Sequence, residues 1–212
     1  MPNKPYKTLL TQATDTLVIN KSRFLCHGRP CRTEEEAVQF IKEMRSKFSD
    51  ASHNCYAYAI GENMGIMRYS DDGEPAGTAG LPMMEVIKTR QITNCCVVIT
   101  RYFGGILLGA GGLVRAYSSG CAKALDACGE GTVFPSERIS IDVSYPNLGR
   151  LEYFLRTQPV RDVEKEFGAS VKLSLTIKQQ DSEVFISGLI QSLDGKVTLD
   201  RTELEPLAWV DQ

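Results

Sequence analysis

The chain has 212 residues, of which 42% are hydrophobic and 24% charged, and its formal net charge is −2. This length allows one or two domains with an ordinary buried core, and the charge argues against a generally basic nucleic-acid-binding protein. No apolar run approaches the roughly 18 residues of a membrane helix, and the first residues do not resemble a signal peptide. We therefore expect a cytoplasmic protein without a membrane partner.

The first 128 residues alternate between strand and helix patterns. Alternating apolar residues indicate strands, whereas apolar residues three or four apart indicate helices with one buried face. A capping box formed by Thr33 and Glu36 marks the start of the first helix. In chain order, the predicted elements are strands within 14–31 around a turn at 20–22, a helix at 34–47, a hairpin of 55–60 with 66–69, a helix starting at 78 or 80, and a strand at 95–100 buried on both faces.

A glycine-rich junction follows the buried strand, and a helix pattern resumes at Leu113 and continues to Cys128. Glycine is favoured where the backbone turns with positive φ or passes close to another group. A junction of this kind also exposes amide N–H groups, which bind anions. The glycines at this junction are Gly104, Gly105, Gly109, Gly111 and Gly112.

Arg101 and Arg115 flank this junction. A cation in the first turns of a helix opposes the helix dipole, so Arg115 suggests a functional role. With Ser118 on the same face, the two arginines and five glycines are predicted to bind an anion or a nucleic acid. The alternative is that Gly111 and Gly112 let the helix pack tightly on the sheet while the arginines pair with carboxylates. The spacing fits neither a dinucleotide-binding motif nor a P-loop.

Three carboxylates, those of Asp71, Asp72 and Glu74, lie within four residues. They can hold Mg²⁺ or act as acid and base, they can belong to an Asp-Gly turn, or they can pair with Arg101 or Arg115. We predict a supporting role for them, with no metal, no cofactor and no catalytic residue. The two histidines are isolated in the sequence and are interpreted as structural. The seven cysteines contain no CxxC pair and are interpreted as reduced core thiols.

The pattern changes at residues 129–136, GEGTVFPS, which predicts a boundary between domains at 1–130 and 137–212. Residues 1–135 carry a charge of +2 (15 basic, 13 acidic) and residues 136–212 a charge of −4 (9 basic, 13 acidic), so an anion-binding surface is expected in the first half. The second half has the order of a ferredoxin-like fold. Its predicted elements are a strand at 139–145, a helix from 147 towards 159, strands at 160–167 and 171–177, a helix at 182–193 and a strand at 197–204.

Two long motifs carry a family resemblance. SDDGEPAGTAG at 70–80 and RYFGGILLG at 101–109, followed by AGGLVRAY, resemble the signature of the IMPACT family in its bacterial two-domain form. The resemblance implies an α+β protein with two domains. The first is expected to be an α/β sandwich like the fourth domain of elongation factor G, and the second a ferredoxin-like domain like the fifth.

Three functions are compatible with these observations. The preferred one is a non-catalytic, translation-linked protein that recognises RNA or a ribosomal surface. The second is a Mg²⁺-dependent enzyme that binds a phosphorylated or nucleotide substrate. The third is a protein-interaction module in stress regulation, because eukaryotic relatives bind the activator of an amino-acid-starvation kinase. Those relatives rely on an additional N-terminal domain with no counterpart in this sequence.

Overall fold

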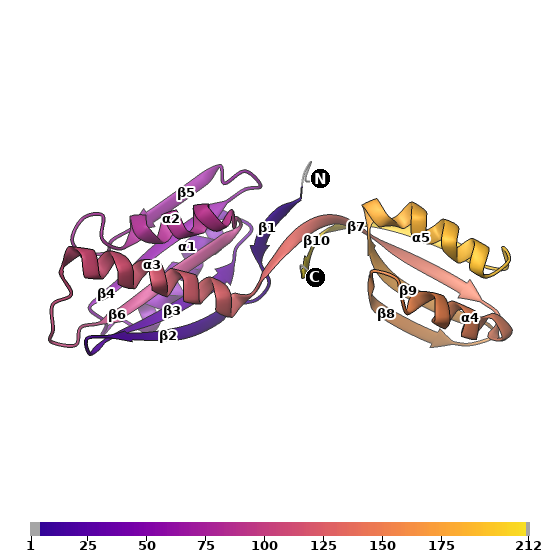
Figure 1. The fold of residues 1–212 in the computed structure, drawn as a ribbon, viewed down its shortest axis with the longest axis horizontal. Coiled ribbons are helices and arrows are strands. Elements are labelled where there is room, and N and C mark those ends of the chain that lie inside the picture. Colours follow the sequence, from indigo (N-terminus) through magenta and orange to yellow (C-terminus); the bar gives the residue numbers. More distant parts are fainter. Residues whose placement is uncertain (1–4, 211–212) are drawn as a thin grey trace. The chain divides into compact units, whose positions relative to one another are not determined.

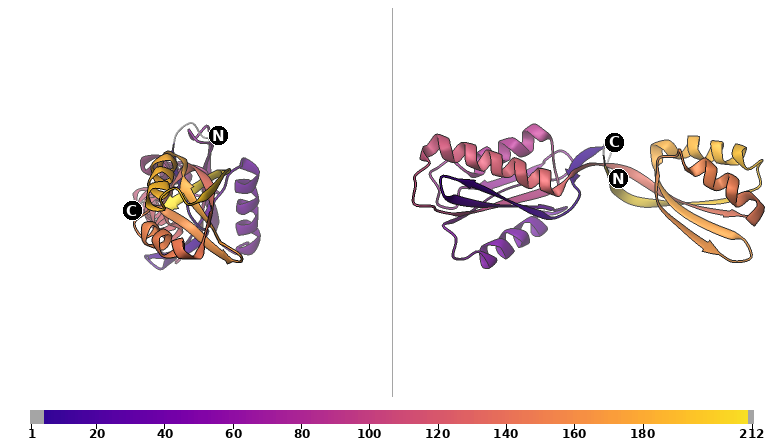
Figure 2. Two further views of the ribbon diagram at one scale, coloured as in Figure 1. Left: turned by 90° about the vertical axis from the view of Figure 1, so that its right-hand side faces the viewer. Right: turned by 60° about the horizontal axis from the view of Figure 1, so that its bottom comes forward.

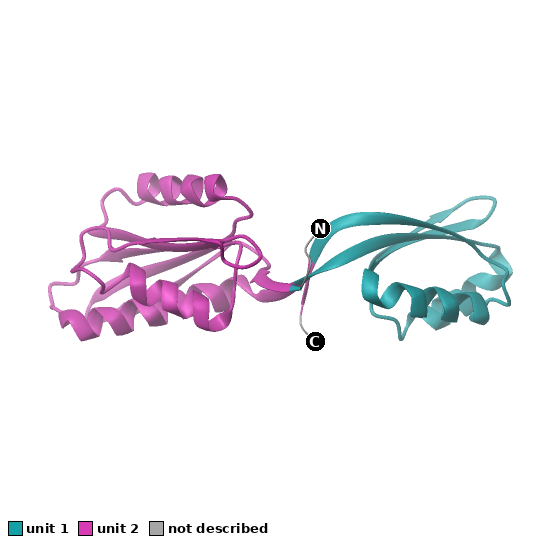
Figure 3. Cartoon of the chain, turned by 90° about the horizontal axis from the view of Figure 1, so that it is seen from above, with its two compact units in different colours: residues 1–5, 133–207 teal, residues 6–132, 208–212 magenta. Residues whose placement is uncertain are grey.

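The computed structural model describes residues 5–210 and divides them into two compact units (Figures 1 and 3). Among the described residues, the N-terminal unit comprises Tyr6–Thr132 and 208–210, and the C-terminal unit comprises Val133–Leu207 and Pro5. None of the described helices is long and apolar enough to cross a membrane.

The N-terminal unit is built on an antiparallel sheet whose strands lie in the order β2-β3-β6-β4-β5. Helices α2 and α3 cover one face of this sheet and α1 covers the other (Figure 2). The bounds are β1 Tyr6–Leu9, β2 Ala13–Ile19, β3 Ser22–Pro30, α1 Glu34–Lys47, β4 His53–Ile60, β5 Ile66–Ser70, α2 Gly80–Arg90, β6 Cys95–Tyr102 and α3 Gly109–Cys128. The order of predicted elements is present, and β1 is an addition to it.

Strand β6 is the centre of this unit, because β3 and β4 flank it and all its residues up to Arg101 are buried. Its alternate side chains enter two cores. Cys95, Val97 and Ile99 pack under α2 and α3, whereas Cys96 and Val98 pack under α1. Burial on both faces explains the unbroken apolar run in the sequence.

The C-terminal unit has the βαββαβ order expected of a ferredoxin-like fold. Its strands lie in the order β8-β9-β7-β10, and α4 and α5 cover one face of the sheet (Figure 3). The bounds are β7 Glu130–Val143, α4 Tyr145–Leu155, β8 Val160–Phe167, β9 Val171–Lys178, α5 Gln179–Ser192 and β10 Thr198–Val210. Together the units confirm the α+β, two-domain prediction.

Residues 129–136, where the sequence predicts a domain boundary, do not form a separate loop. From Glu130 onward these residues belong to β7, and the boundary between the units falls inside that strand, after Thr132. Glycine is required at 131 for packing, because a Cβ there would lie 2.7 Å from the carbonyl oxygen of Trp209 and 2.5 Å from a methyl carbon of Leu10. A glycine that allows close approach has the same sequence signature as a glycine in a linker.

We expect a fragment comprising residues 133–207 to unfold cooperatively on its own. Its core of eleven buried residues, from Ile139 to Leu193, lies wholly within these bounds. A unit with its own hydrophobic core can fold alone. Thermal unfolding followed by circular dichroism checks this expectation. A broad, non-cooperative change would mean that the core needs the rest of the chain.

Candidate functional site

The glycines of the junction have different structural roles. A Cβ on Gly104 would lie 2.1 Å from the carbonyl carbon of Lys21, so this glycine is where the loop after β6 packs against the β2–β3 turn. Gly105 and Gly109 have φ of 81° and 68°, which glycine adopts readily. A Cβ on Gly111 would meet nothing within 4 Å. The alternative in which Gly111 lets the helix pack tightly on the sheet is therefore wrong for this residue.

Helix α3 begins at Gly109, four residues before the predicted start, so several of these glycines lie in its first turn. Its N-cap residue, Leu108, provides no capping side chain, and the first turn contains no acidic residue. The first amide groups of a helix have no partner within the helix. The exposed amides that the glycine pattern suggested are thus at the start of α3.

Arg101 is buried, and one of its terminal nitrogens donates a 2.6 Å hydrogen bond to Glu74 Oε1. The other lies 3.4 Å from the Ser22 hydroxyl. The guanidinium is also close to the rings of Phe24 and Phe103, at 5.4 and 5.5 Å from their centroids. The Arg101–Glu74 pair is one of the alternatives that the sequence left open, and it joins the end of β6 to the loop before α2.

The three clustered carboxylates make different contacts. Asp71 accepts hydrogen bonds from the amides of Gly77, Ala79 and Gly80 and so caps α2. Asp72 accepts from Arg45 and from the amide of Asn54. Neither is free to bind a metal without losing these bonds, and the described residues contain no group of metal-ligating side chains. Glu74 is buried and accepts from the Tyr117 hydroxyl at 2.8 Å in addition to Arg101.

His53 belongs to this site, although the sequence suggested that it was isolated. The register of β4 against β6 places His53 directly opposite Arg101. Its Nδ1 lies 2.8 Å from the carbonyl oxygen of Asp72, and its Nε2 lies 3.9 Å from Glu74 Oε2. The hairpin pattern at 55–69 was visible in the sequence, but the pairing of its first strand with β6 was not.

These side chains line a cleft of about 480 Å³ between the loop before α2 and the loop that leads into α3. Glu74 and Arg101 line it together with His53, and Phe103, Leu107 and Leu113 supply apolar walls. Gly109 and Ala110, the first residues of α3, complete it. The cleft therefore combines a helix N-terminus, a buried ion pair and an apolar surface.

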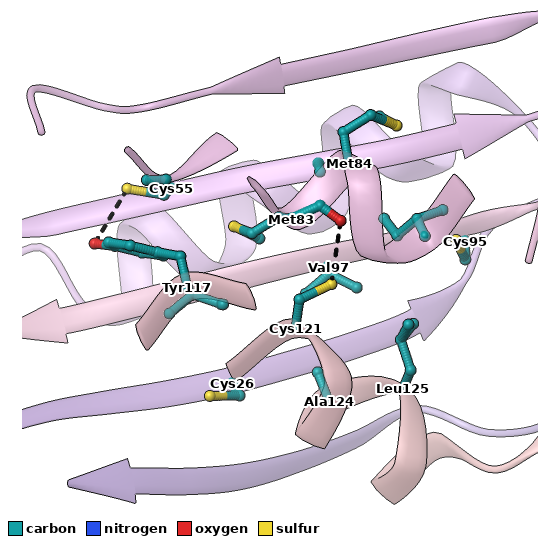
Figure 4. Packing of buried hydrophobic residues seen from close by; sticks show 14 of the residues in the cluster. Cys26, Cys55, Met83, Met84, Cys95, Val97, Tyr117, Cys121, Ala124 and Leu125 are labelled. Atoms are coloured by element: carbon teal, nitrogen blue, oxygen red, sulfur yellow. Dashed lines mark hydrogen bonds between the residues drawn. The ribbon is translucent and has the colours of Figure 1, made fainter. Parts of the chain in front are cut away.

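Behind the cleft, the Cys55 thiol lies 3.4 Å from the Tyr117 hydroxyl oxygen (Figure 4). The same thiol lies 3.0 Å from the carbonyl oxygen of Asp71. Burial raises the pKa of Cys55 to about 12. It also raises the pKa of Tyr117 well above its ordinary value. Both groups stay protonated at neutral pH, so neither is an activated nucleophile.

Arg115 and Ser118 do not line this cleft. Arg115 is exposed on α3, and within residues 5–210 it has no hydrogen-bond or ion-pair partner. Ser118 lines a separate groove with residues of α2, among them Leu81 and Pro82. Arg101, the start of α3 and the glycine loop are thus brought together, whereas Arg115 and Ser118 lie elsewhere on the same helix.

Comparison with known proteins shows the family to which this chain belongs. A model described as the Impact N-terminal domain matches residues 20–125, and a domain of unknown function, DUF1949, matches residues 141–196. The chain belongs to the IMPACT family. The two segments that carry the IMPACT signature, 70–80 and 101–117, provide Glu74 on one side of the cleft and Arg101 with the start of α3 on the other. The two segments of the family signature therefore meet at the candidate site.

Bacterial members of the IMPACT family match most of the chain. IMPACT family member YvyE of Bacillus subtilis is 38% identical over 94% of this chain and 92% of its own length. IMPACT family member YigZ of Escherichia coli is 32% identical over 90% of this chain and 96% of its own length. A crystal structure of a hypothetical protein, 29% identical, covers 92% of this chain and 96% of its own, with a TM-score of 0.58.

Proposed function

We propose that this protein is a non-catalytic, translation-linked factor that binds RNA, including RNA on the ribosome, through one end of its N-terminal unit. This end, the basic tip, consists of Lys21 in the β2–β3 turn, Arg23 near the start of β3, Tyr102 and Phe103 at and after the end of β6, and Arg115 in the second turn of α3. Figure 1 shows that the turn, the end of β6 and the start of α3 lie at the same end of this unit. The packing of Gly104 on Lys21 holds the end of β6 against the β2–β3 turn.

The observation that carries the proposal is the charge of this tip. The sequence contains no acidic residue between Asp15 and Glu34 or between Glu85 and Asp126. In the described part of the chain, Lys21, Arg23 and Arg115 form no ion pair. Unpaired cations of this kind attract phosphate groups and make binding dependent on salt concentration.

Aromatic side chains accompany these cations. The Arg23 guanidinium lies 4.8 Å from the Tyr102 ring centroid, and the side chain of Phe103 is 49% exposed. Bases stack on exposed aromatic rings in proteins that bind single-stranded nucleic acids. The combination of rings and cations favours RNA over a purely anionic small ligand at the tip.

The C-terminal unit is not suited to contact RNA through its groove. Asp142, Glu164, Glu166 and Asp200 line this groove, with only Lys165 and Lys172 to offset them. An excess of carboxylates repels phosphate groups. We expect this unit to stabilise or dock the protein without binding RNA.

One observation favours a protein partner as the second candidate. Leu107 is 86% exposed, and Ile106 beside it is 43% exposed. Exposed apolar side chains in one loop are typical of protein interaction sites. A protein partner at this loop would be insensitive to the charge changes described next, so the same experiment separates the two candidates.

Reversing two charges of the basic tip, in the variant Lys21→Glu with Arg115→Glu, should weaken RNA binding by about tenfold or more. Binding to a structured RNA is measured by fluorescence anisotropy, and association with ribosomes by sucrose-gradient sedimentation at low salt. If each cation contacts one phosphate, the plot of log K for RNA binding against log salt concentration should also become less steep by about 2 in the variant.

The matched control is Lys42→Glu, at an exposed lysine of α1. It changes the net charge in the same direction but lies outside the basic tip, so its RNA affinity should stay near that of the wild type. Equal RNA binding by the tip variant and the wild type, or no binding by either, would overturn the proposal. Ribosome association that survives in the tip variant would favour a protein partner.

A further inference from the structure

We propose that the cleft between Glu74, Arg101 and the start of α3 binds a ribonucleotide, that is, a phosphate ester on a ribose that carries a base and a free 2′,3′-diol. The ligand is held by three parts of the cleft, each with its own chemistry. The inference goes beyond RNA binding at the basic tip, because the cleft is lined by different residues, with Phe103 common to both.

The start of α3 provides the phosphate site. This helix has twenty residues, and its N-cap and first turn supply neither a capping side chain nor a carboxylate. Its dipole and free amide groups therefore attract an anion at Gly109 and Ala110, both of which line the cleft.

Arg101 is an independent indication of a ligand. Its side chain is 6% exposed and lines the cleft, yet its Nε has no hydrogen-bond partner among the described residues. A buried donor without a partner is costly, and this one is screened from solvent, so a ligand oxygen reaches it only when the guanidinium shifts towards the cleft. Its charge also offsets that of Glu74, which would otherwise repel a phosphate.

Glu74 and His53 provide the site for the diol. Glu74 Oε1 accepts from both Arg101 and Tyr117, whereas no protein donor within residues 5–210 reaches Oε2. Because the Asp72 carbonyl can only accept, His53 must donate from Nδ1, and its Nε2 remains an acceptor in the neutral ring.

In the neutral tautomer of His53 that is protonated at Nδ1, Glu74 Oε2 and His53 Nε2 are two acceptors 3.9 Å apart. This distance is too long for a direct hydrogen bond. Two neighbouring hydroxyl groups, as in the 2′,3′-diol of a ribose, each offer one donor and so match this pair. A single hydroxyl or a deoxyribose would leave one acceptor without a partner.

The apolar walls provide the site for the base. Phe103, Leu107 and Leu113 line the cleft next to the polar groups. A base gains stabilisation by stacking on an aromatic ring. The volume of about 480 Å³ lies within the range of small-ligand sites. Phosphate, diol and base thus each have a complement in one cleft.

The test uses the full-length protein and adenosine 5′-monophosphate in isothermal titration calorimetry. The variant Ala110→Asp adds a carboxylate to the first turn of α3. This change favours the helix, so the fold should be retained, but it repels the phosphate and should weaken binding about tenfold or more. The matched control, Ala169→Asp, places the same charge at an exposed position in the C-terminal unit and should bind as the wild type does.

Two further ligands test the other contacts. Adenosine, which lacks the phosphate, and 3′-deoxyadenosine 5′-monophosphate, which lacks one hydroxyl, should each bind about tenfold more weakly than the parent nucleotide. Absence of binding at millimolar nucleotide, or equal affinity of wild type and Ala110→Asp, would overturn the proposal. Equal affinity for the 3′-deoxy ligand would overturn the assignment of Glu74 and His53.

A free nucleotide and the 3′-terminal residue of an RNA share this chemistry. An oligoribonucleotide with a free 3′ end that displaces the mononucleotide, while its 3′-phosphorylated form does not, would identify the RNA end as the ligand. An oligoribonucleotide that does not compete would identify the free nucleotide. Both results support the cleft site. Failure of RNA binding at Lys21 and Arg115 would not affect the mononucleotide result, so the two proposals fail separately.

Discussion

Replacing Arg101 with methionine should lower the free energy of unfolding by about 3–5 kcal/mol, the usual cost of removing one partner of a buried ion pair. The side chains of Arg101 and Glu74 are 6% and 3% exposed, so water cannot replace the lost partner. The Glu74 carboxylate would keep only the Tyr117 hydroxyl as a donor. Urea unfolding followed by fluorescence or circular dichroism measures the change.

Two variants make this result specific to the ion pair. The double variant Arg101→Met with Glu74→Leu removes both charges and should recover much of the lost stability, because an apolar pair leaves no buried charge. Arg115→Met removes an exposed arginine from the same motif and should change stability by less than about 0.5 kcal/mol. Equal effects of Arg101→Met and Arg115→Met would contradict the assignment of Arg101 as the structural arginine.

Gly104→Ala should also destabilise the protein, by about 1–3 kcal/mol or more, because its Cβ would lie 2.1–2.4 Å from three backbone atoms of Lys21 and Ser22. These atoms cannot move away as the end of a flexible side chain can. The loop after β6 must then separate from the β2–β3 turn. Thermal and urea unfolding of the variant measure the cost, and weaker RNA binding is expected to accompany it.

Gly111→Ala is the matched control, and it should raise the stability of the protein where Gly104→Ala lowers it. A Cβ at this position meets nothing within 4 Å, and alanine is favoured over glycine in a helix by up to about 1 kcal/mol. A rise in melting temperature for Gly111→Ala beside a fall for Gly104→Ala would confirm that the glycines differ in role. Equal destabilisation by both would mean that the start of α3 packs more tightly than the structure indicates.

Local patterns predicted most of the fold. The bounds of α1, Glu34–Lys47, were predicted from the capping box at Thr33 and Glu36 and from the spacing of apolar residues. Such patterns are reliable because helix caps and buried stripes are determined within a few residues. The ferredoxin-like order of the second half was predicted in the same way. The continuity of β7 was not, because Gly131 and Pro135 have the same pattern in a strand that packs closely as in a linker.

The candidate site could be predicted only in part. Arg101 and the glycines were identified because they lie in one segment. His53 was missed because its position opposite Arg101 depends on the pairing of two strands that are more than forty residues apart. The sequence also did not show which glycine packs against the backbone, because the contact of Gly104 with Lys21 depends on tertiary structure.

The distribution of cysteines has a practical consequence. All seven lie in the N-terminal unit, are buried and carry free thiols, and residues 133–207 contain none. Because a thiol must reach solvent as a thiolate to react, an alkylating reagent labels each cysteine only when its surroundings open. Cys31 and Cys96 would report openings beneath α1, whereas Cys55 and Cys121 would report openings beneath α2 and α3 (Figure 4). The unmodified protein thus carries its own set of reporters, which resolve the motions of the two helical layers of one unit.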